Sequence, residues 1–212
     1  MLLRLKHSYK NSLQLLKPLD GLAPLLLRLI LAPVLIQAGW NKFSHFDNTV
    51  AWFGNSDWGL GLPLPWLLAT LAIAAELIGG ILLLLGLMTR LVTIPLLITM
   101  LVAIFSVHLP YGWPAIADTS SWLADGTILL NERVMDSSEK IEAARSLLQQ
   151  HGNYDWLTSS GKLVVLNNGI EFAAMYFAML LSLLFSGGGR YVSVDYWLHR
   201  IWQPRNSDVV RH

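Results

Sequence analysis

Four long runs of apolar residues divide the chain and predict four membrane-spanning helices. They extend over about Leu22–Trp40, Leu64–Met88, Leu91–Leu109 and Leu163–Phe185. About 20 apolar residues, at a rise of 1.5 Å each, cross a hydrocarbon core roughly 30 Å thick. The pattern therefore predicts an all-α fold: a polytopic membrane protein built as a four-helix transmembrane bundle.

The connection between the third and fourth spans, residues 110–162, is long and polar. Within it, Asp136 and Glu139 have the spacing of a capping box, and Gly152 is typical of a helix end. We therefore expect an outer, periplasmic loop with a helix inserted between spans three and four. The loop is large enough to form a lid but not a core of its own.

Basic residues flank the spans on one side. They stand before the first span, in the turn after the second and behind the fourth: Arg4, Lys6, Lys10, Lys17, Arg90, Arg190, Arg200, Arg205 and Arg211. Short basic flanks face the cytoplasm. Four spans place both termini on the same side, so we expect both termini in the cytoplasm.

The ends of the chain complete this organisation. Residues 1–19 lack the apolar run and cleavage site of a signal peptide and predict a basic amphipathic segment on the membrane surface. Residues 20–198 form the expected membrane domain, with Asp20 as a possible cap of its first helix. Residues 199–212 form a basic cytoplasmic tail.

Composition agrees with a membrane protein. Of 212 residues, 54% are hydrophobic and 14% are charged, whereas soluble domains average about 25% charged residues. The chain has no cysteine, which excludes disulfide exchange, thiolate-bound iron–sulfur clusters and cysteine zinc sites within it. We expect a lipid bilayer around the protein and no nucleic-acid partner.

Two opposite charges lie inside predicted spans. By helical rise, Arg28 and Glu76 each lie roughly 12 Å from the cytoplasmic side, on helices expected to be antiparallel neighbours. A carboxylate at this depth costs about 2.5–3.5 kcal/mol without compensation. We therefore predict a structural ion pair between Arg28 and Glu76 that locks the two helices. A role in proton movement or ligand binding is the alternative.

A second polar layer is predicted near the outer surface, where three helix ends reach one level. Its members are Gln37, Asn41, Lys42, His108, Asn167, Asn168 and Glu171, with Trp40, Tyr111 and Trp113 as nearby aromatic walls. The position of Lys42 is well explained by a side chain that extends from the membrane to water. This explanation fits Glu171 less well, because apolar residues follow it. We take Glu171, His108 and Lys42 as candidate catalytic residues, and candidate ligand-binding residues are Gln37, Asn41, Asn168, Trp40 and Trp113.

The spacing of histidine and methionine residues does not favour a metal or haem site. Only His108 lies near a span, although a membrane haem usually takes two histidines within the bundle. Met175 and Met179 could present sulfur to copper, but methionines at this helical spacing usually fill cores. We expect no metal site. The small residues Gly79 and Gly80 indicate close helix packing, within the bundle or to another subunit.

Several motifs are distributed along the chain. The first span ends in QAGWNKF, the second contains AAELIGGILLLLGLMTR, and the third ends at His108. The fourth contains NNGIEFAAMYF and is followed by GGGRYVSVDYW. Together these segments resemble the G-x-x-K, E-x-x-G-G…G-x-x-T-R, N-G-x-E and G-x-G-x-x-S-x-D patterns of the DoxX family of bacterial membrane proteins. The resemblance covers most of residues 24–110 and 163–198, and the long outer loop departs from it.

The resemblance implies a multi-pass protein of the bacterial inner membrane. Members are linked to quinol oxidase, to thiosulfate:quinone oxidoreduction and to membrane complexes that handle oxidative stress. We therefore expect a subunit of a membrane redox system, with quinone as candidate ligand and electrons supplied by a protein partner. The alternatives are a non-enzymatic scaffold or assembly partner, a homo-oligomer, or a component of a system that handles metals or modified peptides.

Overall fold

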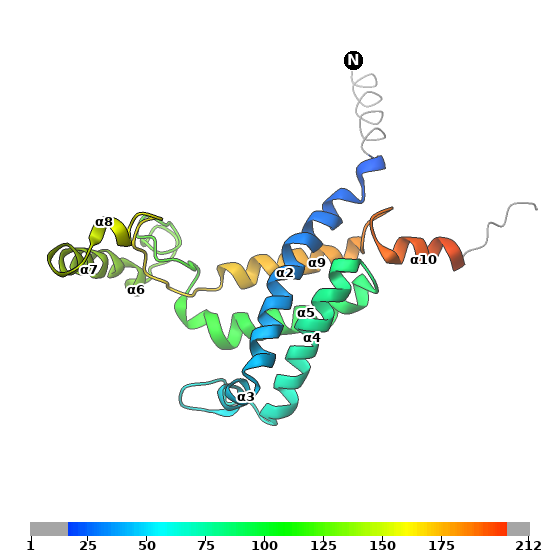
Figure 1. Ribbon diagram of the computed structural model, residues 1–212, viewed down its shortest axis with the longest axis horizontal. Coiled ribbons are helices and arrows are strands. Elements are labelled where there is room, and N and C mark those ends of the chain that lie inside the picture. The colour runs from blue at the N-terminus through cyan, green and yellow to red at the C-terminus, as the bar shows by residue number, and fades with distance from the viewer. Residues whose placement is uncertain (1–16, 203–212) are drawn as a thin grey trace, which may run out of the picture. The chain divides into compact units, whose positions relative to one another are not determined.

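The computed structural model describes residues 17–202, and this part of the chain is helical throughout its regular structure (Figure 1). Within these residues the only extended pairings are isolated bridges, Ile116 with Leu166 and Asp125 with Leu130. The predicted all-α fold is confirmed. Most of the predicted amphipathic segment, 1–19, and the tail beyond residue 202 lie outside the described residues.

The longer connections between the described helices are residues 55–64, 112–131 and 158–170. In chain order they are η1 (Lys17–Leu19), α2 (Leu22–Ser44), α3 (Phe46–Gly54), α4 (Pro65–Leu85), α5 (Thr89–Val102), η2 (Ala103–His108), η3 (Leu109–Tyr111), α6 (Glu132–Met135), α7 (Ser137–His151), α8 (Tyr154–Leu157), α9 (Glu171–Ser186) and α10 (Val194–Trp202). Here η1 and η3 are 3-10 turns, and η2 is a π-helical continuation of α5.

Three stretches of the described chain are long and apolar enough to cross a membrane. They are Lys17–Ser44, Pro65–Leu85 and Thr89–Tyr111, and they correspond to the first three predicted spans. The fourth predicted span is a shorter apolar helix, α9, of 16 residues. Residues 17–202 therefore contain three membrane-length helices and a shorter apolar fourth.

The fourth helix begins at Glu171 rather than at the predicted Leu163 because the preceding residues are held extended. The amide of Ala117 donates to the carbonyl of Val165, and the amide of Asn167 donates to that of Ala115. Asn168 adopts a left-handed conformation with φ of 64°, which an α-helix does not contain. The apolar residues before it thus pair with the loop after η3 instead of starting a helix.

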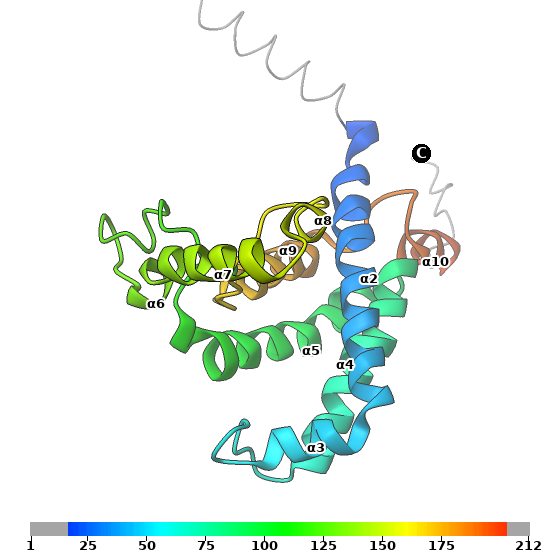
Figure 2. The ribbon, with the colours of Figure 1, turned by 60° about the vertical axis from the view of Figure 1, so that its left-hand side comes forward.

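The chain forms two compact units. One consists of residues up to Thr99 together with those from Phe177 onward, and the other is Met100–Tyr176. In the first unit, α2 and α4 lie side by side in both views, with α3 at the end where the chain turns from one to the other (Figures 1 and 2).

Glycines bring α2 and α4 into direct contact. A β-carbon added at Gly39 would lie 2.7 Å from the backbone nitrogen of Leu77, and one added at Gly80 would lie 2.8 Å from Ile36. Gly79 instead faces Val92 of α5, at 3.3 Å. Small residues allow helix backbones to approach closely, so the predicted glycine face of α4 packs within this unit.

The second unit contains the helices of the outer connection. The helix predicted between Asp136 and Gly152 is present as α7, with bounds Ser137–His151. Its start differs from a capping box, because Asp136 follows α6 directly in helical conformation and makes no side-chain cap. The short helices α6 and α8 are capped instead, by the side chains of Asn131 and Asn153.

The sequence reasoning missed two helices. α3 lies in the connection between α2 and α4, where the pattern of apolar runs predicts no helix. α10 begins at Val194 and continues across the predicted boundary between residues 198 and 199. The start of α2 also differs, because Gly21 is its N-cap and makes no side-chain bond, whereas the expected cap Asp20 faces Arg190.

The contact between α2 and α4 predicts that Gly39→Ala destabilises the protein. The added methyl group would meet backbone atoms, which cannot move aside, so we expect a loss of about 1–3 kcal/mol in the free energy of unfolding. Thermal unfolding in detergent measures the effect. Gln37→Ala, on an exposed position of the same helix, is the control, and equal midpoints for the two variants would contradict the close packing.

Candidate functional site

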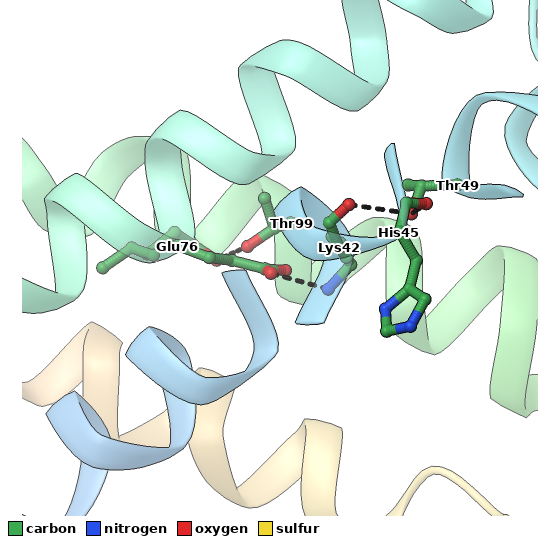
Figure 3. Close-up of polar contacts among 6 residues, drawn as sticks. Lys42, His45, Thr49, Glu76 and Thr99 are labelled. Atoms are coloured by element: carbon green, nitrogen blue, oxygen red, sulfur yellow. Dashed lines mark hydrogen bonds and ion pairs between the residues drawn. The ribbon is translucent and has the colours of Figure 1, made fainter. Parts of the chain in front are cut away.

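An ion pair joins the two glycine-packed helices of the first unit. Lys42 Nζ donates to Glu76 Oε2 at 2.6 Å, and the two side chains point at one another (Figure 3). The Glu76 side chain is 7% exposed and the Lys42 side chain is 27% exposed. The pair therefore consists of a buried carboxylate and an ammonium group that reaches the surface.

The turn after α2 positions Lys42. This residue lies in the last turn of α2, and the chain reverses at His45 into α3. The Thr49 hydroxyl of α3 donates to the carbonyl of Lys42 at 3.2 Å (Figure 3). His45 Nδ1 donates to the carbonyl of Asn41 at 3.0 Å. These bonds attach α3 to the end of α2 and hold the backbone that carries the ammonium group.

The structure replaces the predicted Arg28–Glu76 pair with the Lys42–Glu76 pair. The glycine contacts set Gly39 against Leu77, so Glu76 lies level with the last turns of α2 and far along that helix from Arg28. Depths counted from the predicted span ends missed this register, because α2 continues to Ser44 and α4 already ends at Leu85.

Arg28 stabilises the end of α4 instead. It is fully buried, and its Nη1 donates to the carbonyls of Leu83 and Leu84 at 3.4 and 3.3 Å. Its Nη2 donates to the carbonyl of Val192 at 2.8 Å. The last carbonyls of a helix lack intrahelical donors and favour a cation. A side chain at Gly86 would collide with this guanidinium group.

Asp195 of α10 accepts hydrogen bonds from free backbone amides at the start of α5. Its carboxylate accepts from the amides of Met88 and Thr89 at 2.6 and 2.9 Å, and its own amide donates to the carbonyl of Gly86 at 2.9 Å. A carboxylate at a helix N-terminus satisfies free amides and interacts favourably with the helix dipole. We call this arrangement of Arg28, Gly86 and Asp195 the joint.

The joint brings together two distant motifs of the sequence. Gly86 and Thr89 belong to the segment that ends the second span, and Ser193 and Asp195 follow the fourth. A β-carbon added at Gly188 would lie 2.7 Å from both the Thr89 hydroxyl and Ser193. The sequence pattern showed the two motifs separately, and the hydrogen bonds show that they connect helix ends.

An open cavity of about 790 Å³ lies beside the joint. It is lined by Asp20, Pro24, Met88, Arg90, Leu91, Ser186, Gly187, Gly188, Gly189, Arg190, Ser193, Asp195, Tyr196 and His199. Arg190 Nη1 lies 3.6 Å from Asp20 Oδ2. None of these residues is among the predicted site residues, because Arg90 and Arg190 have the pattern of basic residues that flank spans.

Part of the predicted outer layer meets within the second unit. His108 Nδ1 donates to the carbonyl of Asn168 at 2.8 Å. Glu171 Oε2 accepts from the amide of Ala115 at 2.9 Å, and the Glu171 amide donates to the carbonyl of Trp113 at 3.1 Å. The Glu171 carboxylate thus holds the loop after η3 against the start of α9.

The remaining residues of the predicted layer have other surroundings. Asn167 is buried and donates to the carbonyls of Tyr111 and Pro114, each at 2.7 Å. Gln37 and Asn41 lie at exposed positions of α2. Trp40 is exposed as well and contacts the ring of Phe43, with ring centroids 5.8 Å apart. Among residues 17–202, no three His, Asp or Glu side chains are grouped to hold a metal ion.

Comparison with known proteins identifies the larger part of the first unit. Residues 23–109 match the DoxX family. The chain is 36% identical over 85 residues to the Bacillus subtilis (strain 168) protein named "Putative oxidoreductase CatD". This alignment covers 40% of the chain and 59% of that protein, so the chain spans less than two thirds of its relative. No solved structure matches the chain. The match confirms the predicted resemblance to the DoxX family over residues 23–109.

The Lys42–Glu76 pair predicts strong coupling in a double-mutant cycle. Lys42→Met leaves a buried carboxylate without its partner, and Glu76→Gln leaves an unpaired ammonium group. We expect each single change to lower the unfolding midpoint in detergent, and the double change to cost less than their sum by about 0.5–3 kcal/mol. Additive effects would contradict the pair.

The joint predicts that Asp195→Ala destabilises the protein by about 1–2 kcal/mol, because two amides at the start of α5 lose their acceptor. Thermal unfolding measures the loss. Asp47→Ala is a matched control, since Asp47 lies in the first turn of α3 and that helix has no side-chain cap bond. The assignment fails if both variants unfold at the same temperature.

Proposed function

We propose that this protein is a membrane subunit of a redox system linked to quinone or quinol. The observation that carries the proposal is the Lys42–Glu76 pair within the membrane-length helices α2 and α4. Reduction of a quinone to a quinol takes up two electrons and two protons. The Lys42 ammonium group can donate a hydrogen bond to a quinone oxygen, and the Glu76 carboxyl group can exchange a proton with the ligand.

The surroundings of Lys42 suit a flat apolar ligand. Trp40 and Phe43 lie in the same turn of α2, contact one another and are both exposed. Their rings offer an exposed aromatic surface in the last turns of α2, the helix that carries Lys42. Binding sites for such ligands combine apolar walls with a few polar groups. In this proposal the chain binds, orients and protonates the quinone, and a protein partner supplies or removes the electrons.

The comparisons support a redox role. The region that matches the DoxX family contains both residues of the pair, and the name of the Bacillus subtilis relative includes the word oxidoreductase. A membrane charge pair retained only for packing is the competing explanation, since buried pairs also fix helix registers.

We further propose a multi-pass arrangement in the bacterial inner membrane with both termini in the cytoplasm. The beginning of α2, the turn between α4 and α5 and the turn before α10 line one cavity, so the basic flanks of three spans lie at one end of the first unit. Short basic flanks favour the cytoplasm. The Lys42–Glu76 pair then lies nearer the outer side.

A quinone-linked activity assay in membrane vesicles tests the proposal. Glu76→Gln removes the exchangeable proton and should lower the activity by about 100-fold or more, at equal protein abundance and with an intact elution profile. Glu76→Asp keeps the carboxylate and should retain part of the activity. Full activity of folded Glu76→Gln would overturn the proposal.

The same assay separates the two carboxylates considered for this role. Glu171→Gln changes a carboxylate that accepts a backbone hydrogen bond in the second unit, and we expect little loss of activity. A loss with Glu171→Gln but not with Glu76→Gln would assign the quinone site to His108 and Glu171 instead.

One observation favours a second candidate function, that of a scaffold for a partner protein. The second unit exposes large apolar side chains, among them Trp122, Leu130 and Trp156, and exposed apolar patches mark interaction sites. Under this alternative, deletion of residues 121–152 abolishes capture of the partner in a pull-down, whereas Glu76→Gln leaves capture unchanged.

A further inference from the structure

The cavity beside the joint is lined by two arginines, Arg90 and Arg190, and by two aspartates, Asp20 and Asp195. Both oxygens of Asp195 accept from the amides of Met88 and Thr89, so this carboxylate is already engaged by a helix N-terminus. The Asp20 carboxylate lies 3.6 Å from Arg190 Nη1. Arg90 donates one bond, from Nη2 to the carbonyl of Phe185 at 3.1 Å, and a guanidinium group has five N–H donors in total.

The chemistry of these groups suits a phosphate. Arginine presents its donors as a planar fork that matches phosphate oxygens, and such charge-assisted bonds are short and strong. Arg90 and Arg190 lie on different turns of the chain and line the same cavity, together with the imidazole of His199. A phosphate group between the two arginines would receive donors from both.

A glycine loop opens the cavity to a ligand. Gly187 and Gly189 adopt positive φ angles of 75° and 93°, a conformation that side chains disfavour. Gly188 has no room for a β-carbon, because Thr89 and Ser193 pack against it. All three line the cavity, so its wall here is bare backbone that a headgroup can approach closely.

The helix α10 indicates that the phosphate belongs to a lipid. Asp195 and His199, one turn apart, line the cavity with Tyr196. The other positions of α10 expose apolar side chains: Val194, Trp197, Leu198, Ile201 and Trp202. Tryptophans and an apolar face opposite a polar one are typical of a helix in the membrane interface. Arg200 lies over the ring of Trp197, 5.6 Å from its centroid.

We infer that this cavity binds the phosphate headgroup of an anionic phospholipid, held by Arg90 and Arg190, with the acyl chains beside the apolar face of α10. A phospholipid in the same leaflet brings its phosphate to the level of an interfacial helix and its chains to the apolar side. The site is separate from the Lys42–Glu76 pair and does not depend on the quinone proposal.

Native mass spectrometry of the full-length protein, titrated with phosphatidylglycerol or phosphatidylcholine in detergent, tests this inference. We expect the wild type to retain phosphatidylglycerol preferentially. Arg90→Gln with Arg190→Gln should weaken this binding at least about tenfold, since each basic residue contributes to the attraction of anionic lipid. Arg145→Gln, in the second unit, is the arginine control and should bind as the wild type does.

A gain of binding separates the inference from misfolding. Asp20→Asn removes the carboxylate that competes for Arg190 and should strengthen retention of phosphatidylglycerol, which a damaged protein cannot do. Equal retention of the two lipids by the wild type, or unchanged binding by the double arginine variant, would overturn the inference. So would complete displacement of the lipid by an equimolar amount of glycerol phosphate, because the ligand would then be a soluble phosphate.

Discussion

The contact between α2 and α4 determines most of the first unit. Gly39 and Gly80 allow the two backbones to touch, and this contact admits one register, because a shift would place side chains where only hydrogen atoms fit. In that register Glu76 lies within reach of Lys42, and Arg28 lies at the end of α4. The close helix contact thus decides which polar groups meet inside an apolar pair of helices.

The charged residues of this unit have two different kinds of partner: backbone groups at helix ends, or a side chain of opposite charge. Arg28 and Asp195 are held by backbone groups at helix ends, where unpaired carbonyls and amides require partners. They connect α2, α4, α5 and α10 into one arrangement and leave no side-chain oxygen of Asp195 without a donor. Lys42 and Glu76 are held by one another, and one of the two reaches the surface. The joint therefore has a structural role, whereas the Lys42–Glu76 pair is the one we propose to exchange protons.

The positions of most long helices could be predicted from the sequence, whereas the partners of the charged side chains could not. The apolar runs identified the three membrane-length helices, and Asp136 and Gly152 bounded α7 closely. The charge of Glu76 indicated that it needs a partner but not which one, because the relative register of α2 and α4 decides whether Arg28 or Lys42 lies opposite it. The run before α9 was read as helix, since backbone pairing between residues 163–170 and the loop after η3 leaves no periodic signal. The cavity was missed because its arginines are also topological signals.

The protonation state of Glu76 during quinone turnover tests the central claim most directly. Redox-induced infrared difference spectroscopy of the protein in lipid, with bound quinone, records the carboxyl groups that gain or lose a proton. The account predicts a carboxyl band that changes when the quinone is reduced, shifts in Glu76→Asp and is absent in Glu76→Gln. A difference spectrum with the same carboxyl bands in wild type and Glu76→Gln would contradict it.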